Sequence, residues 1–332
     1  TVKISEKGLR YDLTVPFARF VVNHFNDISF PFKRYQVQPV WRADKPQKGR
    51  YREFYQCDVD VIGSDSLMNE VELVQIIHDV FKRLSLKVVT KLNNRKILAG
   101  IAEVAGASDR FTDLTVSLDK LDKIGPDKVR QEMIDKGFSQ EQLDLIDPFL
   151  KITGNNAERM EYLERHFTSS EVGMKGIKEM EYIFERLEIA GIAGGCEFDI
   201  TLARGLNYYT GTIFEVKAKE TEIGSICGGG RDKEPTGIFG LPGVSGVGIS
   251  FGADRIYDVL QTLDRFPEHD LSKTQVLVVN FGENEEKYCL GVAIKLREAG
   301  IVTELFPDAG KLKKQMKYAD QKQIPFVVLI GE

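Results

Sequence analysis

The stretch RGLNYYTG, residues 204–211, places one guanidinium and two phenols between two glycines. Arginine keeps its charge at physiological pH and presents a rigid fork of donors that matches phosphate or carboxylate. Tyrosine adds a flat apolar ring with a polar tip. An ordinary turn between strands, with an exposed arginine, could contain the same residue types. The stretch alone is therefore compatible with a surface turn or with a pocket for an anion and a flat polar ligand.

A second candidate is the stretch REFYQCDVDVIG, residues 52–63, in which polar and apolar residues alternate as in a two-faced strand. One face would carry Arg52, Phe54, Gln56, Asp58 and Asp60. The other face would carry Tyr55, Cys57, Val59 and Val61. We expect the apolar face to pack on a core and the polar face to be solvated or to line a cleft. The aromatic ring in the polar row favours a cleft that stacks a flat base, whereas Asp58 could be merely exposed and is left out of the site.

The segments around these stretches predict a mixed architecture. A strand over 33–42, a polar loop and the strand over 52–63 predict a long antiparallel hairpin. Apolar spacing predicts a helix over 66–84, and amphipathic charged segments predict helices from 95 to 187. Glycines flank the strands that follow 226, which indicates close approach of a ligand or a second backbone. Beyond 274, a β-α-β-α-β pattern predicts an α/β unit with a buried sheet.

Composition excludes several classes of protein. The chain has 332 residues, is 42% hydrophobic and 29% charged, and has a net charge of −5, which indicates a globular protein of two or three domains. No apolar run is long enough to span a membrane. The cysteines are Cys57, Cys196, Cys227 and Cys289. Because they form no CxxC pair, we expect reduced thiols, a cytoplasmic protein and no metal held by protein side chains. His78 is expected to pack within its helix.

Four separate blocks occur in one order along the chain. They are LRYDLTVPFAR (9–19), VWRADKPQKGRYREFYQCDVDVIG (40–63), LARGLNYYTG (202–211) and GVGISFGADRI (246–256). Together they resemble the histidyl-tRNA synthetases, a family of class II aminoacyl-tRNA synthetases. The second block is similar to class II motif 2, the fourth to motif 3, and the third to a signature of the histidine-specific enzymes. The resemblance covers nearly the whole chain.

The resemblance implies an α+β catalytic domain, with an antiparallel sheet flanked by helices, a helical insertion and a C-terminal α/β anticodon-binding domain. The catalytic domain would occupy 1–95 and 194–266, the insertion 96–193, and the anticodon-binding domain 273–332, which is expected to be incomplete. Motif 1, which forms the dimer interface in the family, is not found. We therefore expect a longer natural chain that forms a homodimer.

The resemblance also implies the reaction. Histidine is activated with ATP to histidyl-adenylate and pyrophosphate, and is then transferred to the 3′ end of tRNA(His). Arg42 and Arg204 match the two catalytic arginines at the α-phosphate, where charge gathers in the transition state. The other positions that match ATP-binding residues are Asp44, Arg50, Arg52, Phe54 and Arg255. Mg²⁺ is expected to accompany the phosphates.

The amino-acid pocket follows from the same resemblance. Asp12, Thr14 and Gln56 match residues that bind the ammonium group. Asp60 and Tyr209 match the pair that brackets the imidazole, with Arg204 and Tyr208 beside them. Simpler roles remain open for three of these residues: Asp12 could only cap a helix, Arg52 could form a surface ion pair, and Tyr208 could be a core residue.

Two other functions remain possible. Relatives of these synthetases include a regulatory subunit of ATP phosphoribosyltransferase and a sensor of uncharged tRNA, which keep the fold and lose catalytic groups. Retention of Arg42, Arg204 and Arg255 favours the enzyme. Another class II synthetase is disfavoured by RGLNYYTG. The basic segment KLKKQMKYADQK, residues 311–322, is either a solvated helix face or an RNA contact. The direct run from Arg231 into Asp232 departs from the family pattern.

Overall fold

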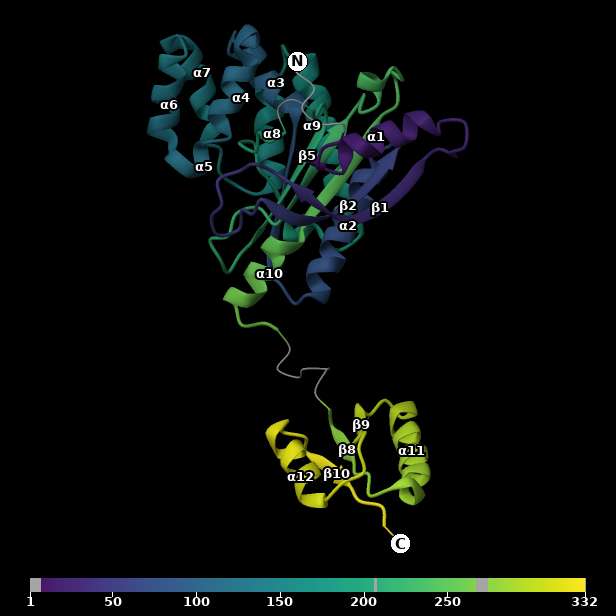
Figure 1. The fold of residues 1–332 in the computed structure, drawn as a ribbon. Coiled ribbons are helices and arrows are strands. Elements are labelled where there is room, and N and C mark those ends of the chain that lie inside the picture. The colour runs from purple at the N-terminus through teal and green to yellow at the C-terminus, as the bar shows by residue number, and fades with distance from the viewer. Residues whose placement is uncertain (1–6, 206–207, 267–273, 332) are drawn as a thin grey trace. The chain divides into compact units, whose positions relative to one another are not determined.

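The computed structural model describes residues 7–205, 208–266 and 274–331, which belong to two compact units (Figure 1). The first unit lies within residues 1–264 and the second within 265–332. Two residues of the RGLNYYTG stretch, Leu206 and Asn207, lie outside the described residues, as does position 273 at the expected start of the anticodon-binding domain.

The first unit is built on a seven-stranded sheet in the order β1-β2-β7-β6-β5-β3-β4. Its strands are β1 (Phe32–Trp41), β2 (Glu53–Ile62), β3 (Val88–Asn94), β4 (Cys196–Phe198), β5 (Thr212–Ala218), β6 (Cys227–Asp232) and β7 (Gly246–Gly252). All neighbouring pairs are antiparallel except β3 and β4. The predicted hairpin is the pair β1 and β2. The antiparallel sheet expected for the α+β fold is confirmed.

Three helices flank the strands that carry the candidate residues. They are α1 (Thr14–Asn23), α2 (Met68–Arg83) and α10 (Ala253–Thr262). Helix α2 packs on the sheet through Phe81, whose ring centroid is 5.8 Å from that of Phe251. The prediction that His78 is packed is wrong, because its side chain is exposed. It follows the buried Ile77 by about 100° around the helix and so points away from the sheet.

A run of helices separates β3 from β4. It comprises α3 (Arg95–Val104), α4 (Phe111–Leu118), α5 (Leu121–Ile124), α6 (Pro126–Asp135), α7 (Gln140–Leu150), α8 (Asn156–His166) and α9 (Glu171–Ile189), with 3-10 turns η1 (Ser108–Arg110), η2 (Ala193–Gly195) and, after β6, η3 (Gly237–Phe239). Ser139 and Asn155 begin α7 and α8 with reciprocal capping boxes. The helices share one apolar core with the sheet, for example where Phe184 of α9 meets Phe198 of β4.

The second unit is a small α/β sandwich. Its elements are β8 (Val276–Val278), α11 (Glu283–Glu298), β9 (Thr303–Leu305), α12 (Leu312–Gln321) and β10 (Phe326–Val328). The strands are parallel in the order β10-β8-β9, and the central strand β8 is wholly buried. A parallel sheet needs helices on its faces, and α11 and α12 supply them (Figure 1). The predicted β-α-β-α-β order is confirmed.

Candidate active site

The hairpin and β7 bring a row of polar side chains together. Four cross-strand pairs lie on one face of the hairpin: Arg34 with Asp60, Gln36 with Asp58, Gln38 with Gln56, and Val40 with Phe54. Strand β7 continues the row, with Gly248 opposite Asp60 and Ser250 opposite Asp58. Directly paired residues lie about 5 Å apart, so the row is a continuous surface. The four β2 residues predicted to share one face therefore do so. Their cross-strand neighbours on β1 and β7 could not be identified from the sequence alone.

Asp58 is the main correction to the sequence analysis. It is 2% exposed, which excludes the merely exposed position that the sequence left open for it. The reason is that β2 is an interior strand, with β1 on one side and β7 on the other, so cross-strand neighbours cover the carboxyl group. Burial raises the pKa of Asp58, partly offset by the Ser250 hydroxyl and by Arg34. Asp12 and Arg42 also act on this pKa, which places both of them near the row.

Asp60 is buried in the same row. Burial raises its pKa to about 7, although Arg34 opposes the shift. Its Oδ2 atom lies 2.8 Å from Arg34 Nη2 in an ion pair that does not have hydrogen-bond geometry. Titratable groups with such displaced pKa values concentrate at functional sites.

Three buried acceptor atoms of the row have no hydrogen-bond partner among the described residues: Gln56 Oε1, Asp58 Oδ1 and Asp60 Oδ2. Buried polar atoms without partners are rare in folded proteins because each is costly. Gln56 uses its amide to donate to the Ser250 hydroxyl at 3.0 Å, which aims its carbonyl elsewhere. The arrangement suits a ligand that brings donors, such as an ammonium group or a protonated ring nitrogen.

Tyr209 lies against two glycines. A Cβ atom on Gly205 would come within 2.1 Å of the Tyr209 ring, and one on Gly230 within 2.6 Å. Gly205 also has a φ of 64°, a left-handed conformation that favours glycine. Burial raises the pKa of Tyr209 to about 12, with smaller effects from Arg204, Asp58 and Asp60. Tyr208 meets Tyr209 edge to face but is 62% exposed.

Asp12 and Thr14 lie at the start of α1. The Asp12 Oδ1 atom accepts from the Val15 amide at 3.1 Å, so the capping role left open by the sequence is present. Capping uses one carboxylate oxygen. The other interpretation of Asp12, as a ligand residue, is therefore compatible with the cap.

Three guanidinium groups from distant segments act on the pKa of a fourth, that of Arg255. Burial lowers the pKa of Arg255, and Arg204, Arg50 and Arg42 lower it further. Arg42 donates to the Tyr11 carbonyl at 3.2 Å and lies 5.1 Å from the centre of the Phe54 ring. Such a concentration of positive charge is unfavourable by itself and favours binding of a polyanion.

Two carboxylates pair with two of these cations. Arg204 forms an ion pair with Glu215 of β5, which is 7% exposed. In the loop between β1 and β2, Asp44 lies 3.7 Å from Arg50 and accepts from Arg52 through its backbone carbonyl at 3.3 Å. Among the described residues Arg52 has this backbone contact, and the surface ion pair considered for it is not found there.

Contacts across the sheet attach this loop to α10. Arg255 donates to the Gly49 carbonyl at 2.6 Å and to the Ser225 carbonyl at 2.7 Å. The Tyr55 amide donates to Asp254 at 2.7 Å. Motif 2 and motif 3 are therefore joined directly, although about 200 residues separate them along the chain.

Sequence reasoning missed three charged residues here. Glu215 is a lone carboxylate in the apolar strand TIFEVKA, and that signal could have identified it. Arg34 had no distinguishing signal. Arg231, at the end of the glycine-rich β6, forms a buried ion pair with Glu70 and donates to the Ser64 carbonyl and the Ser245 hydroxyl at 2.9 and 2.8 Å. These contacts anchor the segment that departs from the family pattern.

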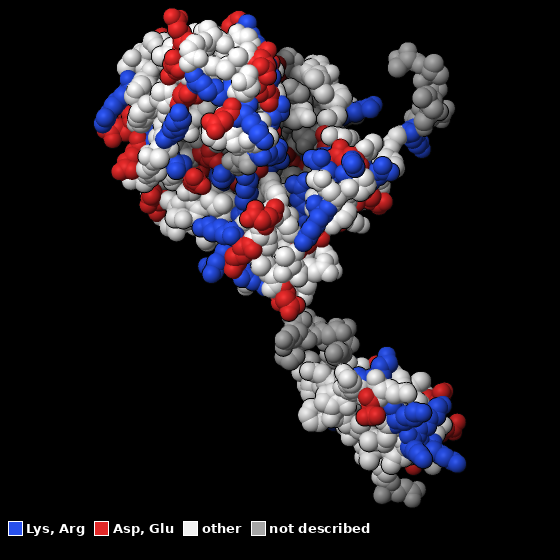
Figure 2. Space-filling model, turned by 90° about the vertical axis from the view of Figure 1, so that its left-hand side faces the viewer, with Lys and Arg blue, Asp and Glu red and all other residues white. Residues whose placement is uncertain are grey.

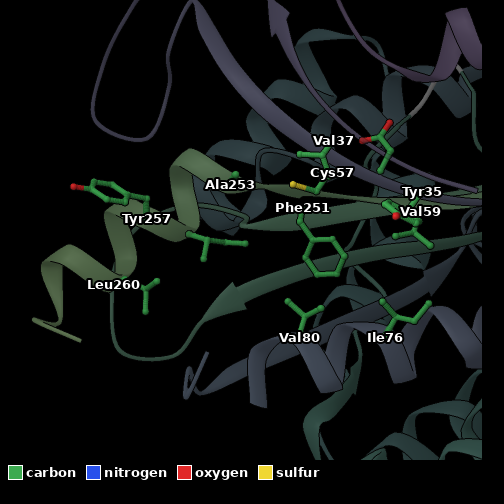
Figure 3. Close-up of a pocket in the computed structure, with 12 residues that line it drawn as sticks. Tyr35, Val37, Cys57, Val59, Ile76, Val80, Phe251, Ala253, Tyr257 and Leu260 are labelled. Carbon is green, nitrogen blue, oxygen red and sulfur yellow. The ribbon is translucent and has the colours of Figure 1, made fainter. Parts of the chain in front are cut away.

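The apolar face predicted for β2 packs on the core through Val61, with Cys57 and Val59 against it, but the other residues of this hairpin face are open. Tyr35, Val37 and Tyr55 are 81%, 54% and 50% exposed. An apolar hollow of about 420 Å³ lies there between the hairpin, α2 and α10. Figure 3 shows Val37, Cys57 and Phe251 around it. The hollow is open because the described residues supply no element that covers β1 on this side.

Metal and membrane features can be assessed only for the described residues. Within 7–205, 208–266 and 274–331, no group of three or more histidine, cysteine, aspartate or glutamate side chains could hold a metal ion. No helix in the same ranges is long and apolar enough to cross a membrane.

Comparison with known proteins decides the family. The model of the histidyl-tRNA synthetase family matches residues 5–256, and the model of an anticodon-binding domain matches 275–332. The chain belongs to the histidyl-tRNA synthetase family. The function predicted from the motifs, activation of histidine with ATP and its transfer to tRNA(His), is confirmed by this membership.

Individual members of the family are similar over almost the whole chain. A histidine–tRNA ligase of Phocaeicola vulgatus is 58% identical over 330 residues, which are 99% of this chain and 73% of the relative. One from Porphyromonas gingivalis is 60% identical with the same coverage. The crystal structure of histidyl-tRNA synthetase from Nostoc sp. PCC 7120 is 34% identical, covers 97% of this chain and 76% of its own, and has a TM-score of 0.86.

The fold alone does not separate the synthetases from their regulatory relatives. A protein of Bacillus halodurans described as an ATP phosphoribosyltransferase regulatory subunit/histidyl-tRNA synthetase has a TM-score of 0.77 at 24% identity, and covers 96% of this chain and 79% of its own. The family's ligases share far more of the sequence.

Proposed function

We propose that Arg42 and Arg204 hold the α-phosphate of ATP beside a histidine bound in the polar row of β2. The observation that carries this proposal is that Arg42, Arg50, Arg204 and Arg255 lie close enough to act on one pKa, next to buried acceptors without partners. The histidine carboxylate then attacks the phosphorus and pyrophosphate leaves.

The two arginines accelerate this step by electrostatics. Negative charge on the phosphate oxygens increases in the five-coordinate transition state, so fixed cations stabilise it more than the ground state. Glu215 holds the Arg204 guanidinium and limits its motion, which keeps the cation oriented before substrate arrives.

The remaining ATP contacts come from the loop and α10. Arg255, Arg50 and Arg52 bind the outer phosphates, Phe54 stacks on adenine, and Asp44 orients the loop arginines. ATP enters as its Mg²⁺ complex. Mg²⁺ would be held mainly by phosphate and water oxygens, as is usual for this ion beside a nucleotide, and would offset the phosphate charge.

Histidine is bound at both ends. Asp12, Thr14 and Gln56 bind the ammonium group, in agreement with the unpaired Gln56 carbonyl oxygen. Asp60 accepts from one imidazole nitrogen, and Tyr209, a donor because its pKa is about 12, serves the other. Tyr208 and Arg204 line the wall. A pocket of paired polar groups rejects apolar amino acids because they leave its buried groups without partners.

The second unit contacts tRNA. Figure 2 shows basic side chains gathered on this unit. Helix α12 and its flanks carry exposed lysines at 311, 313, 314, 317 and 322. Such a cluster binds a phosphate backbone. We assign 273–332 to anticodon binding, 96–193 to a helical insertion, and 1–95 with 194–266 to catalysis.

The protein acts as a homodimer in the cytoplasm. The open apolar hollow beside Tyr35 and Val37 supports an oligomer, since exposed apolar patches of this kind mark interfaces. The four cysteines are free thiols, which agrees with a reducing compartment. Sedimentation of the full-length protein at several concentrations tests the dimer, and a monomer at all of them would refute it. Cell fractionation tests the compartment.

ATP–pyrophosphate exchange on the full-length protein tests the catalytic proposal. We expect exchange with histidine and none with threonine, proline or glycine. Absence of exchange with every amino acid would instead indicate a binding-only relative. Exchange with another amino acid would refute the pocket assignment and leave the ATP site standing.

A further inference from the structure

Arg34 connects two parts of the proposed histidine pocket. Its Nη2 atom lies 2.8 Å from Asp60 Oδ2 and donates to the Leu13 carbonyl at 3.2 Å. Leu13 lies between Asp12 and Thr14. One guanidinium therefore contacts the carboxylate at the imidazole end and the turn at the ammonium end.

The Arg34 guanidinium is held through its two terminal nitrogens, whereas its buried Nε atom has no hydrogen-bond partner among the described residues. The side chain is 9% exposed, and its guanidinium lies 4.0 Å from the centre of the Phe17 ring in α1. Its Nη1 atom donates to Gln36, and the Gln36 amide donates to Gln38 at 3.0 Å. These contacts restrict the Arg34 guanidinium and, through it, the groups that it binds.

We propose that Arg34 is a positioning residue for histidine activation, which holds Asp60 and the Asp12–Thr14 turn at the separation that a histidine molecule requires. The inference rests on the proposed assignment of Asp60, Asp12 and Thr14 to the histidine pocket. Arg34 acts through these residues and does not touch the reacting atoms.

A planar fork is needed for this task. Arginine contacts both Asp60 and the Leu13 carbonyl through Nη2, while Nη1 in the same rigid plane donates to Gln36 and so fixes the position of Nη2. Lysine has the same charge but concentrates it at one atom on a flexible stem. An Arg34→Lys variant would pair with Asp60 or with Leu13 and would not hold both at the observed separation.

Charge on Asp60 provides a second, independent readout. The groups that act on its carboxyl group are Arg34 on β1 and Asp58 on β2, and Tyr209 is affected by it in turn. Strand β7 contributes Gly248, which has no titratable group. Arg34 is the only cation in this described set, and it opposes the rise caused by burial. Its removal should therefore raise the pKa of Asp60 further above 7.

The test compares Arg34→Lys and Arg34→Met in histidine-dependent pyrophosphate exchange with the full-length protein. For Arg34→Lys we expect the KM for histidine to rise about tenfold, because one charge-assisted hydrogen bond is lost. The KM for ATP should change by less than about twofold. For Arg34→Met we expect kcat/KM for histidine to fall about 100-fold. The acidic limb of the pH profile of kcat/KM should also move to higher pH.

Lys33→Met is the matched control. Lys33 is the neighbouring residue on β1, but its side chain is exposed and pairs with Glu72 of α2, away from the pocket. It should leave every kinetic parameter unchanged. Thermal unfolding of each variant separates a folding defect from a kinetic one. If the methionine variant does not fold, the lysine variant, which keeps the charge, still provides the test.

A double-mutant cycle with Asp60→Asn closes the test. If Arg34 acts through Asp60, the two losses in kcat/KM for histidine will not add. If folded Arg34 variants keep the histidine KM and the acidic limb of the wild type, the inference is overturned. The proposed function would still stand, because it is upheld by exchange in the wild type. Equal increases in both KM values would also overturn the inference. Failure of wild-type exchange would refute the proposed function, and the inference with it.

Discussion

The Tyr51 hydroxyl donates to the Asp258 carboxylate, its oxygen 2.7 and 2.9 Å from the two carboxylate oxygens. Tyr51 belongs to the loop between β1 and β2, whereas Asp258 is a buried residue of α10. The bond raises the pKa of Tyr51. It fixes the loop that carries Arg50 and Arg52 against the helix that carries Arg255, and it thereby sets the spacing of the proposed triphosphate contacts.

Tyr51→Phe should loosen this loop without disturbing the amino-acid pocket. We expect the KM for ATP to rise about threefold to tenfold, the cost of one hydrogen bond to a charged acceptor, while the KM for histidine stays within about twofold. Steady-state pyrophosphate exchange measures both. Tyr55→Phe, which removes a half-exposed hydroxyl on the opposite face of β2, is the control. Parallel increases in the two KM values would show that the loop does not act on ATP alone.

Arg204→Lys should lower the rate of adenylate formation more than it weakens substrate binding. A fixed guanidinium at the phosphorus acts mainly in the transition state, so we expect kcat to fall about 100-fold to 1,000-fold. The KM for ATP should change only a few fold. Single-turnover measurements isolate the step. Glu215→Gln should show a smaller loss of the same kind, because it leaves the cation present but less oriented. A variant at position 204 with near-normal kcat would contradict the catalytic assignment.

Tyr209→Phe should weaken histidine binding by the same factor at every pH between 6 and 9. The pKa of Tyr209 is about 12, so the phenol remains protonated and acts as a donor throughout this range. We expect the KM for histidine to rise about tenfold at both ends. Exchange assays at pH 6.5 and pH 9 compare the ratio of variant to wild type. A ratio that collapses towards one at pH 9 would mean that the hydroxyl has ionised.

Glu132 should contribute stability that is lost in acid. Hydrogen bonds from Lys120 and Lys136 lower its pKa to about 2 from an ordinary value of 4.5. A carboxyl group with a depressed folded-state pKa stabilises the fold above 4.5 and loses that contribution as pH falls towards 2. Glu132→Gln should lower the free energy of unfolding at pH 7 by less than about 1 kcal/mol, since solvent screens the pair. Urea unfolding should show the difference shrinking between pH 5 and pH 3.

Much of the fold could be predicted from local patterns. The period of two over 52–63 predicted β2, and helical spacing over 66–84 predicted α2, because both periods follow from backbone geometry. Prediction failed where burial depended on a partner from elsewhere in the chain. Alternation separated the faces of β2, but it could not show that Asp58 is covered by β1 and β7 or that Tyr35 of β1 is 81% exposed.

The sequence by itself determined the family, the order of its motifs and the kinds of charged groups that those motifs carry. Only the tertiary structure decided that Arg34 faces Asp60, that Glu215 pairs with Arg204, and that guanidiniums from residues 42, 50 and 204 act on the pKa of Arg255. The physical reason is that side-chain type and periodicity are properties of neighbours along the chain. Burial, pairing and pKa depend instead on neighbours across the sheet, some of them about 200 residues distant.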